Sequence, residues 1–258
     1  MNARSHESRI AGQFGPQARA YVESAVHAGG DDLARIAALA KARPGARVLD
    51  LGCGGGHVAF AAAPHARDVT AYDLSDDMLA AVAQEAERRG LANIATRQGA
   101  AERLPFADAD FDMVVTRFSA HHWRDVPAAL GEVRRVLAPE GLAVFVDLVA
   151  PEDPLLDTHL QAVELLRDPS HVRDYALSQW LAMLAAAGLA AGTVTRRRLR
   201  LDFASWIARM RTPDIHAAAI RSLQEGAADP IRRHFAIEPD GTFSADTATI
   251  EARKAAIA

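Results

Sequence analysis

The feature that most constrains the fold is a short strand pattern that runs directly into a glycine-rich turn. Residues 47–51, Arg-Val-Leu-Asp-Leu, are followed by Gly-Cys-Gly-Gly-Gly at 52–56, and helical apolar spacing begins at once over residues 57–62. Such a strand, turn and helix form the first unit of many alternating α/β folds, because glycine lets the backbone approach a ligand where a Cβ would collide. We therefore expect this turn to face a bound ligand.

The alternation of strand and helix continues along the chain. Apolar runs predict strands over residues 69–73, 94–98, 111–116 and 142–147, and helical spacing predicts helices over 75–89, with Ser75 as N-cap, and over 126–137. Strands that alternate with helices indicate a doubly wound α/β fold with a mostly parallel, Rossmann-like sheet.

The two ends of the chain carry mainly helical patterns. Residues 7–43 predict two helices broken at Gly29-Gly30, and beyond Pro154 the pattern predicts helices over 155–166 and 178–187 and a strand over 192–196. The final segment, 203–258, mixes helical spacing with prolines and leaves the last strand undetermined. A sheet of about seven strands is expected.

The charge and composition exclude several classes of protein. With 29 basic residues against 33 acidic ones, the net charge of -4 gives no general attraction to nucleic acid, which is not an expected partner. No apolar stretch approaches the ~18 residues of a membrane span, and the first nine residues lack a secretory pattern. A single cysteine, Cys53, suits a reducing compartment. A soluble, cytoplasmic protein without a membrane span is expected, and Cys53 is expected to pack within the turn.

The spacing of the glycines separates two kinds of nucleotide site. A dinucleotide fingerprint that starts at Gly52 needs a glycine at position 57, which is His57 here. Asp73, at the end of the second strand, supplies a carboxylate that can accept two hydrogen bonds from ribose hydroxyls. An acidic residue at this position also occurs in nicotinamide enzymes, and the glycine turn alone also fits an ordinary strand–helix connection. A pyrophosphate-binding helix start is nevertheless disfavoured.

Three further segments follow the glycine turn in a characteristic order. Gly-Ala-Ala-Glu-Arg-Leu-Pro-Phe at 99–106 follows the third strand, Phe-Asp-Met-Val-Val at 111–115 forms the fourth, and Glu-Val-Arg-Arg-Val-Leu-Ala-Pro-Glu-Gly at 132–141 precedes the fifth. Together with Asp-Leu-Gly-Cys-Gly-Gly-Gly at 50–56, they resemble the methyltransferase type 11 family of class I S-adenosylmethionine (SAM)-dependent methyltransferases. The chain is similar to the bacterial enzymes of ubiquinone and menaquinone biosynthesis over about residues 14–149.

The resemblance implies SAM as the cofactor and S-adenosylhomocysteine as its product. In this family the glycine loop cradles the amino-acid end of SAM. Relatives often carry Asp where this chain has Ala100, so Glu102 or backbone groups would have to serve the adenine amino group. By position, the implied cofactor-binding residues are Phe14, Tyr21, Asp50, Gly52, Gly54, Gly56, Asp73, Leu74, Ala101, Glu102, Arg117 and Phe118.

The N-terminal segment 13–21 resembles the helical lid of the family. Phe14 and Tyr21 would close over SAM, exclude water and offer aromatic faces to its cationic sulfur. Amphipathic core packing explains the same two residues. The implied organisation is a single domain over residues 1–258, with a lid at 1–43, a cofactor-binding half at 44–150 and substrate-side and C-terminal elements at 151–258.

Candidate catalytic residues are few, because methyl transfer from an activated sulfonium does not require a strong base. His121 and His122 follow the fourth strand and are candidate bases, although capping or packing explains this His-His-Trp turn as well. His171 and Arg173 are candidates to hold an anionic substrate, or else belong to a polar helix boundary. No metal is expected, because the histidines lack zinc-type spacing.

Two further groups allow alternative interpretations. Arg196, Arg198 and Arg200 would share one face of a strand, as a charged sheet edge or a phosphate-binding patch. Large residues at helical spacing, namely Trp180, Trp206 and Met210, would line an apolar pocket or belong to the core.

The expected function is methyl transfer from SAM to a carbon or oxygen of a small-molecule acceptor. A noncatalytic SAM-binding regulatory or partner module is the alternative from another class, and a nicotinamide-dependent oxidoreductase is a third. The sequence determines neither the acceptor nor the oligomeric state.

Overall fold

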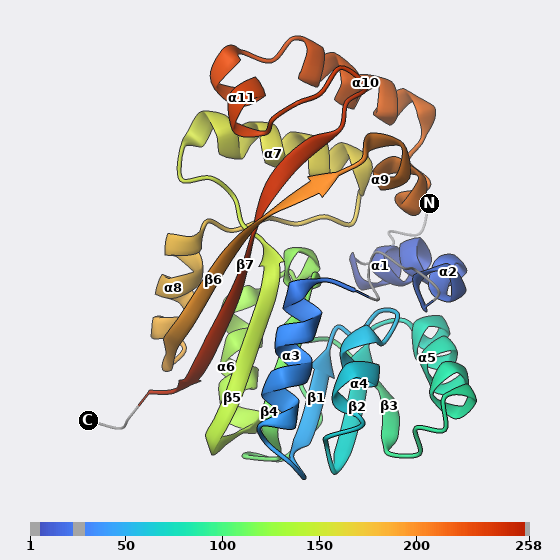
Figure 1. Cartoon of the computed structure of the whole chain (residues 1–258), viewed down its shortest axis with the longest axis vertical. Coiled ribbons are helices and arrows are strands. Elements are labelled where there is room, and N and C mark those ends of the chain that lie inside the picture. Colours follow the sequence, from blue (N-terminus) through green and yellow to red (C-terminus); the bar gives the residue numbers. More distant parts are fainter. Residues whose placement is uncertain (1–5, 23–28, 256–258) are drawn as a thin grey trace.

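A seven-stranded sheet forms the centre of the protein, with helices on both faces (Figure 1). The computed structural model describes residues 6–22 and 29–255. The strands are β1 (Arg47–Leu51), β2 (Asp68–Asp73), β3 (Ile94–Gln98), β4 (Phe111–Arg117), β5 (Leu137–Leu148), β6 (Leu189–Leu201) and β7 (Phe243–Lys254). Their order is β3-β2-β1-β4-β5-β7-β6; β1 to β5 pair in parallel, and β7 runs antiparallel to both of its neighbours. The predicted doubly wound, mostly parallel sheet is confirmed.

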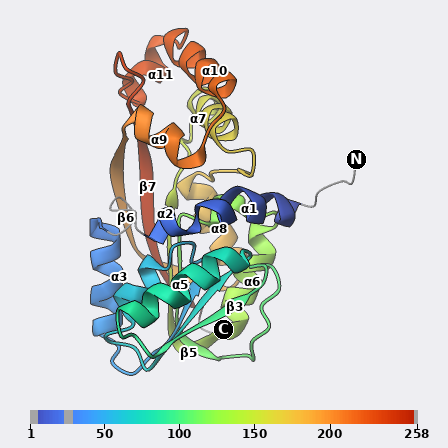
Figure 2. The same cartoon turned by 90° about the vertical axis from the view of Figure 1, so that its right-hand side faces the viewer.

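The helices form two layers on the sheet and a third group beyond the upper end of β5 (Figures 1 and 2). None of those that the structure describes is long and apolar enough to cross a membrane. One face carries α3 (Asp31–Lys41), α4 (His57–Ala62) and α5 (Asp76–Arg88); the other carries α6 (Val126–Val136) and α8 (Leu177–Ala186); the third group is α7 (Pro154–Arg167), α9 (Phe203–Met210), α10 (Asp214–Glu225) and α11 (Asp229–His234).

Three cores follow from this layering. Because successive side chains of a strand point to opposite faces, Val48 packs with the α3 to α5 layer and Leu49 with the α6 and α8 layer. Both faces of β1 are therefore buried, which explains its nearly continuous apolar sequence. A third core lies between the extended ends of β6 and β7 and the surrounding helices, where the Trp206 ring meets Phe243 edge-on at 5.0 Å between centroids.

Most predicted elements are confirmed, and two strands differ in length. Ser75 caps α5 as predicted, since its side chain accepts a hydrogen bond from the Met78 amide. β5 begins at Leu137 rather than near residue 142, because Leu137 pairs with Phe111 across a register shift in β4. The strand predicted over 192–196 extends over the whole of β6, and the undetermined last strand is β7. These two strands pair along their length, from Leu189 opposite Lys254 to Leu201 opposite Phe243.

An N-terminal helical segment, residues 6–22, crosses the carboxyl ends of the parallel strands (Figures 1 and 2). It comprises α1 (His6–Phe14), the short 3-10 helix η1 (Gly15–Gln17) and α2 (Ala18–Val22). The side-chain Nε2 of Gln13 donates to the Met210 carbonyl at 2.9 Å, and the Tyr21 carbonyl lies 2.9 Å from His57 Nε2. These contacts attach the segment to α9 on one side and to α4 on the other.

Candidate active site

The glycine turn between β1 and α4 has the backbone conformation that its sequence requires. Gly52, Gly54 and Gly56 have φ angles of 71°, 47° and 74°, in the left-handed region that favours glycine. A Cβ at Gly52 would lie 1.9 Å from Ser119 Oγ, and one at Gly56 would lie 2.8 Å from a Val82 methyl group, whereas Gly54 faces open space. Packing therefore fixes the two outer glycines, and the middle one presents bare backbone to a cavity.

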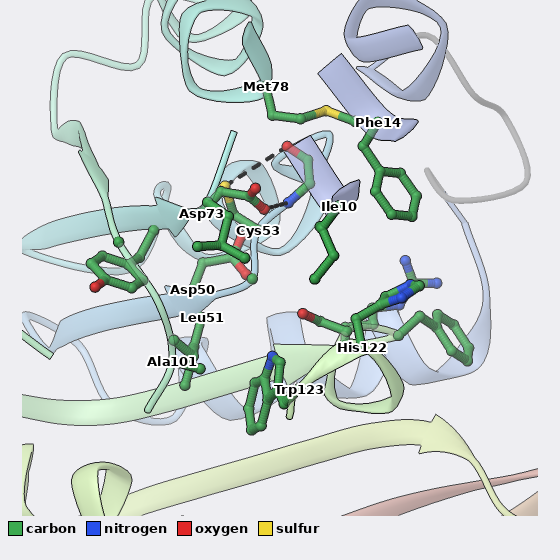
Figure 3. Close-up of a pocket in the computed structure, with 18 of the residues that line it drawn as sticks. Ile10, Phe14, Asp50, Leu51, Cys53, Asp73, Met78, Ala101, His122 and Trp123 are labelled. Atoms are coloured by element: carbon green, nitrogen blue, oxygen red, sulfur yellow. Dashed lines mark hydrogen bonds between the residues drawn. The ribbon is translucent and has the colours of Figure 1, made fainter. Parts of the chain in front are cut away.

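Asp73 fastens this turn to the end of β2. Its Oδ2 accepts a hydrogen bond from the Gly54 amide at 2.9 Å, and its Oδ1 accepts one from the Ser75 amide at 2.9 Å. Figure 3 shows the Asp73 carboxylate beside the loop, inside the cavity. Burial raises the pKa of Asp73, although the backbone amides oppose the shift. Each carboxylate oxygen retains a second acceptor position for a ligand hydroxyl.

Asp50 is buried beneath the same turn. Its Oδ2 accepts a hydrogen bond from the Ala59 amide at 2.9 Å, which ties the end of β1 to α4. Burial, followed by the neighbouring charge of Asp73, raises the pKa of Asp50 to about 7, against the opposing effect of the Ala59 amide. Two carboxylates therefore share this end of the sheet, and both line the same cavity.

A first cavity of about 140 Å³ opens above the glycine turn (Figure 3). Of the residues implied to bind the cofactor, all except Gly56 line it; Gly56 instead packs against Val82. The remaining lining is mainly apolar, with Ile10 from α1, Met78 from α5 and Trp123 before α6. Residues that are distant in sequence thus form one cavity at the carboxyl ends of β1, β2 and β4, the position where open α/β sheets bind ligands.

Glu102 lines this cavity but also has a local structural role. Its Oε1 accepts hydrogen bonds from the Arg124 amide at 3.0 Å and the Asp125 amide at 3.4 Å. The carboxylate therefore holds the turn before α6. Its role as hydrogen-bond acceptor for the adenine amino group stays a prediction.

A second cavity, of about 500 Å³, lies on the other side of the N-terminal helical segment and reaches α9 and β6. Five residues line both cavities: Phe14, Tyr21, Arg117, Phe118 and His122. The Phe14 ring meets Tyr21 and His122 edge-on, at 5.6 and 5.1 Å between centroids. These five side chains, which we call the common wall, border both cavities.

Arg117 and Phe118 shape this wall from the end of β4. Arg117 Nε lies 2.5 Å from Asp32 Oδ2, and the side chains of this ion pair are only 8% and 15% exposed. Phe118 has a φ of 51°, a conformation that costs free energy for a residue with a Cβ. Its amide donates to the Val146 carbonyl at 2.8 Å, which holds the strained residue in place.

The adjacent histidines occupy different electrostatic environments. Burial alone would lower the pKa of His121, but Asp147, whose Oδ1 lies 2.6 Å from His121 Nδ1, outweighs burial and raises it to about 9. For His122, burial and the nearby His121 charge lower the pKa to about 4. At neutral pH, His121 is therefore an imidazolium and His122 a neutral imidazole.

His171 and Arg173 lie outside the lining of both cavities. His171 Nε2 lies 3.0 Å from Gln161 Oε1, and burial followed by the His121 charge lowers its pKa to about 2. Arg173 forms an ion pair with Asp157 at 2.6 Å. Both residues lie between α7 and α8 and already have partners in α7, so their role toward a substrate gains no support from their placement.

A buried acidic cluster surrounds His121. Donor atoms of His121, Asp147 and Asp174 lie within 4.8 Å of one another, a spacing compatible with a metal ion. Neither carboxylate oxygen of Asp174 has a hydrogen-bond partner in the described part of the chain, and burial raises the pKa of this residue well above its ordinary value. Sequence spacing could not reveal the cluster, because Asp174 follows a different secondary-structure element. The expectation that no metal binds stays a prediction.

Sequence reasoning missed several residues of the second cavity. Arg167 ends α7 and Arg209 lies in α9, and both reach the cavity from the part of the chain where the pattern was weakest. Trp206 and Met210, noted at helical spacing, line the cavity and are also buried in the structure. Trp180 is buried in the core between the sheet and α8.

Comparisons with known proteins identify the family of this chain. A family profile described as "Methyltransferase domain" covers residues 49–145. The "Uncharacterized methyltransferase YcgJ" of Bacillus subtilis is 39% identical over 224 residues, which are 87% of this chain and 88% of YcgJ. The chain belongs to the SAM-dependent methyltransferases. The crystal structure of YcgJ superposes on this methyltransferase with a TM-score of 0.85 at 36% identity, covering 88% of this chain and 99% of that one.

Two other relatives are similar to this chain to different extents. This methyltransferase is 50% identical over 201 residues to "Uncharacterized protein YafE" of Escherichia coli, covering 78% of this chain and 97% of YafE. It is 34% identical over 134 residues to a demethylmenaquinone methyltransferase of Chlorobaculum parvum, covering 49% and 53% of the two chains. The predicted family is confirmed, and membership in it rules against the nicotinamide-dependent oxidoreductase and the noncatalytic module.

Proposed function

We propose that this enzyme transfers the methyl group of SAM to a carbon or oxygen of a small molecule bound in the second cavity. The observation that carries the proposal is the common wall, because the five residues that line both cavities would bring a cofactor and an acceptor together. The relative named for demethylmenaquinone supports a small-molecule acceptor.

The first cavity fits SAM by its donor and acceptor groups. The second lone pairs of the Asp73 oxygens would accept hydrogen bonds from the ribose hydroxyls. Gly54 has open space where a side chain would stand, so its backbone can approach the amino-acid end of the cofactor. Leu74 and Ala101 would border the adenine, and Phe14 would present an aromatic face toward the cationic sulfur.

When bound, SAM supplies a methyl group on a positively charged sulfur, which is already activated for displacement. The task of the protein is to align the acceptor with that methyl group and to exclude water. Phe14, Tyr21 and Phe118 would do both, since they form apolar surface on the wall between the cavities.

We assign proton acceptance to His122 where the acceptor is a hydroxyl or an acidic carbon. The Ser170 carbonyl lies 3.2 Å from His122 Nδ1, so this nitrogen carries the proton of the neutral ring and Nε2 keeps its lone pair. His121 is held protonated by Asp147 and would stabilise negative charge on the acceptor instead.

Replacing His122 by Gln should lower kcat by about 100-fold, while the affinity for S-adenosylhomocysteine is retained. An unchanged kcat would contradict the assignment of His122 as the proton acceptor.

The cofactor assignment is tested by calorimetry with S-adenosylhomocysteine. Asp73→Ala should weaken binding by about 10- to 100-fold, because charge-assisted hydrogen bonds contribute about 1.5–3 kcal/mol. Asp76→Ala is the matched control: this carboxylate lies three residues away, is exposed and lies outside the cavity lining. Equal affinities of wild type and Asp73→Ala would contradict the ribose assignment. Release of S-adenosylhomocysteine with a panel of small acceptors then tests turnover.

A further inference from the structure

The second cavity has an excess of arginines on its walls. Arg117, Arg167, Arg197, Arg198, Arg200 and Arg209 all line it. Five of them have a carboxylate partner in the protein: Arg117 with Asp32, Arg167 with Glu164, Arg197 with Asp31, Arg198 with Asp246 and Arg200 with Glu238. Among the residues that the structure describes, Arg209 forms an ion pair with none.

Arg209 also lacks a hydrogen-bond partner at a buried atom. Its Nε is inaccessible to solvent and donates to no acceptor in the described part of the chain. Burial and the nearby Arg167 charge both lower the pKa of Arg209, so its surroundings disfavour the cation as they stand. A buried donor without a partner costs about 1–3 kcal/mol, and more when it is charged. A rotation of the Arg209 side chain that brings this N–H to the cavity would let an anion there supply the missing acceptor.

Arg167 stands beside Arg209 with only weak compensation of its charge. Its Nη1 lies 3.4 Å from Glu164 Oε2, which is long for a charged pair, and its Nε donates to the Trp206 carbonyl at 3.1 Å. Burial raises the pKa of Glu164, which reduces its value as a counterion. Arg209 thus has no ion pair among the described residues and Arg167 has one long contact, while the carboxylates of Asp168 and Asp202 also line the cavity.

Apart from Asp168 and Asp202, much of the wall near these arginines is apolar. Trp206 and Met210 flank Arg209 on α9 and line the cavity with Leu148. The Tyr21 hydroxyl lies 3.1 Å from Met210 Sδ. From this end, the cavity continues to Phe118 and His122 at the common wall.

We propose that the second cavity binds the methyl acceptor as a small organic acid, whose carboxylate or phosphate pairs with Arg209 and Arg167 while its apolar body reaches the common wall. Guanidinium groups recognise these anions through paired N–H donors, and a partly desolvated site strengthens such contacts. The inference rests on the proposed function, because it names the acceptor class of that same site.

The test uses two fluorescent probes that differ by one charge. Anilinonaphthalene sulfonate is an apolar aromatic anion, and phenylnaphthylamine has the same ring system without the sulfonate. With SAM-saturated wild-type enzyme, the anion should bind more tightly than the neutral probe. Arg209→Gln should weaken binding of the anion by at least about tenfold and leave the neutral probe unchanged. Arg209→Lys, which keeps the charge, should recover part of the loss.

Arg200→Gln is the matched control. It removes the same charge from the wall of the same cavity, but Arg200 is paired with Glu238 through two contacts of 2.8 and 2.7 Å. Its affinity for the anionic probe should stay within about twofold of wild type. An equal loss in Arg200→Gln and Arg209→Gln would show a general charge effect and overturn the proposal, as would an unchanged affinity in Arg209→Gln.

Competition against the bound anionic probe separates the sources of the anion. Octanoate, octyl phosphate and octanol present the same chain with a carboxylate, a phosphate or no charge. Stronger displacement by either anion supports the site and identifies the preferred group, whereas equal displacement by octanol overturns it.

Calorimetry with S-adenosylhomocysteine, carried out on the wild type and on Arg209→Gln, distinguishes failure of the acid-binding site from failure of the proposed function. Retained cofactor affinity with no anion preference in wild type would refute only the acid-binding site; absence of cofactor binding in wild type would refute the proposed function itself.

Discussion

Gly52 shows how two physical constraints coincide at one residue. Its φ of 71° is costly for any residue with a Cβ, and the position of that Cβ is occupied by Ser119, whose Oγ and Cβ would lie 1.9 and 2.7 Å away. Rotation of the serine hydroxyl cannot relieve the second contact, so the backbone between β4 and η2 (Ala120–His122) would have to shift. The ligand-binding turn thus depends on the loop that also carries Phe118.

The two constraints can be separated by measurement. Gly45 has a φ of 76° with nothing within 4 Å of its missing Cβ, so Gly45→Ala tests conformation alone. We expect Gly45→Ala to lower the free energy of unfolding by about 1 kcal/mol, and Gly52→Ala to lower it by about 2–4 kcal/mol, because overpacking adds to the strain. Urea denaturation measures both. Equal losses would show that the contact with Ser119 is relieved without cost.

At the scale of elements, the ends of β4 and β5 are joined by a buried charged pair. His121 follows β4, and Asp147 lies near the end of β5. Asp174 lies close to the pair, and the charges of Asp174 and of Glu164 in α7 also raise the pKa of His121. Burial raises the pKa values of both carboxylic acids. The ends of the two strands and the α7 region therefore share one electrostatic environment.

This pair predicts a loss of stability at alkaline pH. The pKa of His121 is raised in the folded protein from 6.5 to about 9, so its contribution is complete below about pH 6.5 and is lost as pH rises to about 9. Over this range the free energy of unfolding of the wild type should fall by up to about 1.4 kcal/mol per pH unit. Asp147→Asn should make this fall shallower. Denaturant midpoints from pH 7.5 to 9.5 measure it; the window avoids Asp50, whose pKa is about 7. A wild-type profile parallel to that of Asp147→Asn would show that the pair does not titrate there.

At the scale of the whole molecule, β7 connects the cofactor-binding sheet with the third core. It pairs with β5 from Ala143 opposite Ala252 to Leu148 opposite Thr247, and its first residue, Phe243, packs against Trp206 in α9. A strand that belongs to both regions should transmit unfolding from one to the other. We therefore expect the chain to unfold as a single cooperative unit.

Trp206→Ala tests this cooperativity. Truncation of the buried ring should lower the unfolding free energy by about 3–5 kcal/mol. The far-ultraviolet circular dichroism and the fluorescence of Trp123 and Trp180 should still report the same midpoint. Ile215→Ala on α10 is the control, because Ile215 is 76% exposed and should change stability by less than about 0.5 kcal/mol. Two separate transitions in the wild type would show that the third core unfolds independently.

Local sequence determined the first four strands and the glycine turn. The strand pattern, the glycine turn and the Ser75 cap depend on residues close together in the chain, so periodicity and turn chemistry predicted β1 to β4 and α5 within a few residues. The same locality placed Asp73 beside Gly54, since parallel strands end at one edge of a sheet. The lengths of β6 and β7 depend on their pairing with each other, which a local pattern does not contain.

The tertiary structure alone decided which residues line the second cavity. Arg167, Arg209 and Tyr21 are far apart in sequence, and only the packing of α7 and α9 against the N-terminal helical segment brings them to one cavity. The protonation of His121 and His122 likewise depends on Asp147 and on burial, neither of which is visible in the His-His-Trp turn. Sequence by itself determined the fold class and the cofactor turn, because both arise from local backbone preferences. Only the tertiary structure decided which arginines of the second cavity form ion pairs, because an ion pair depends on distance in space.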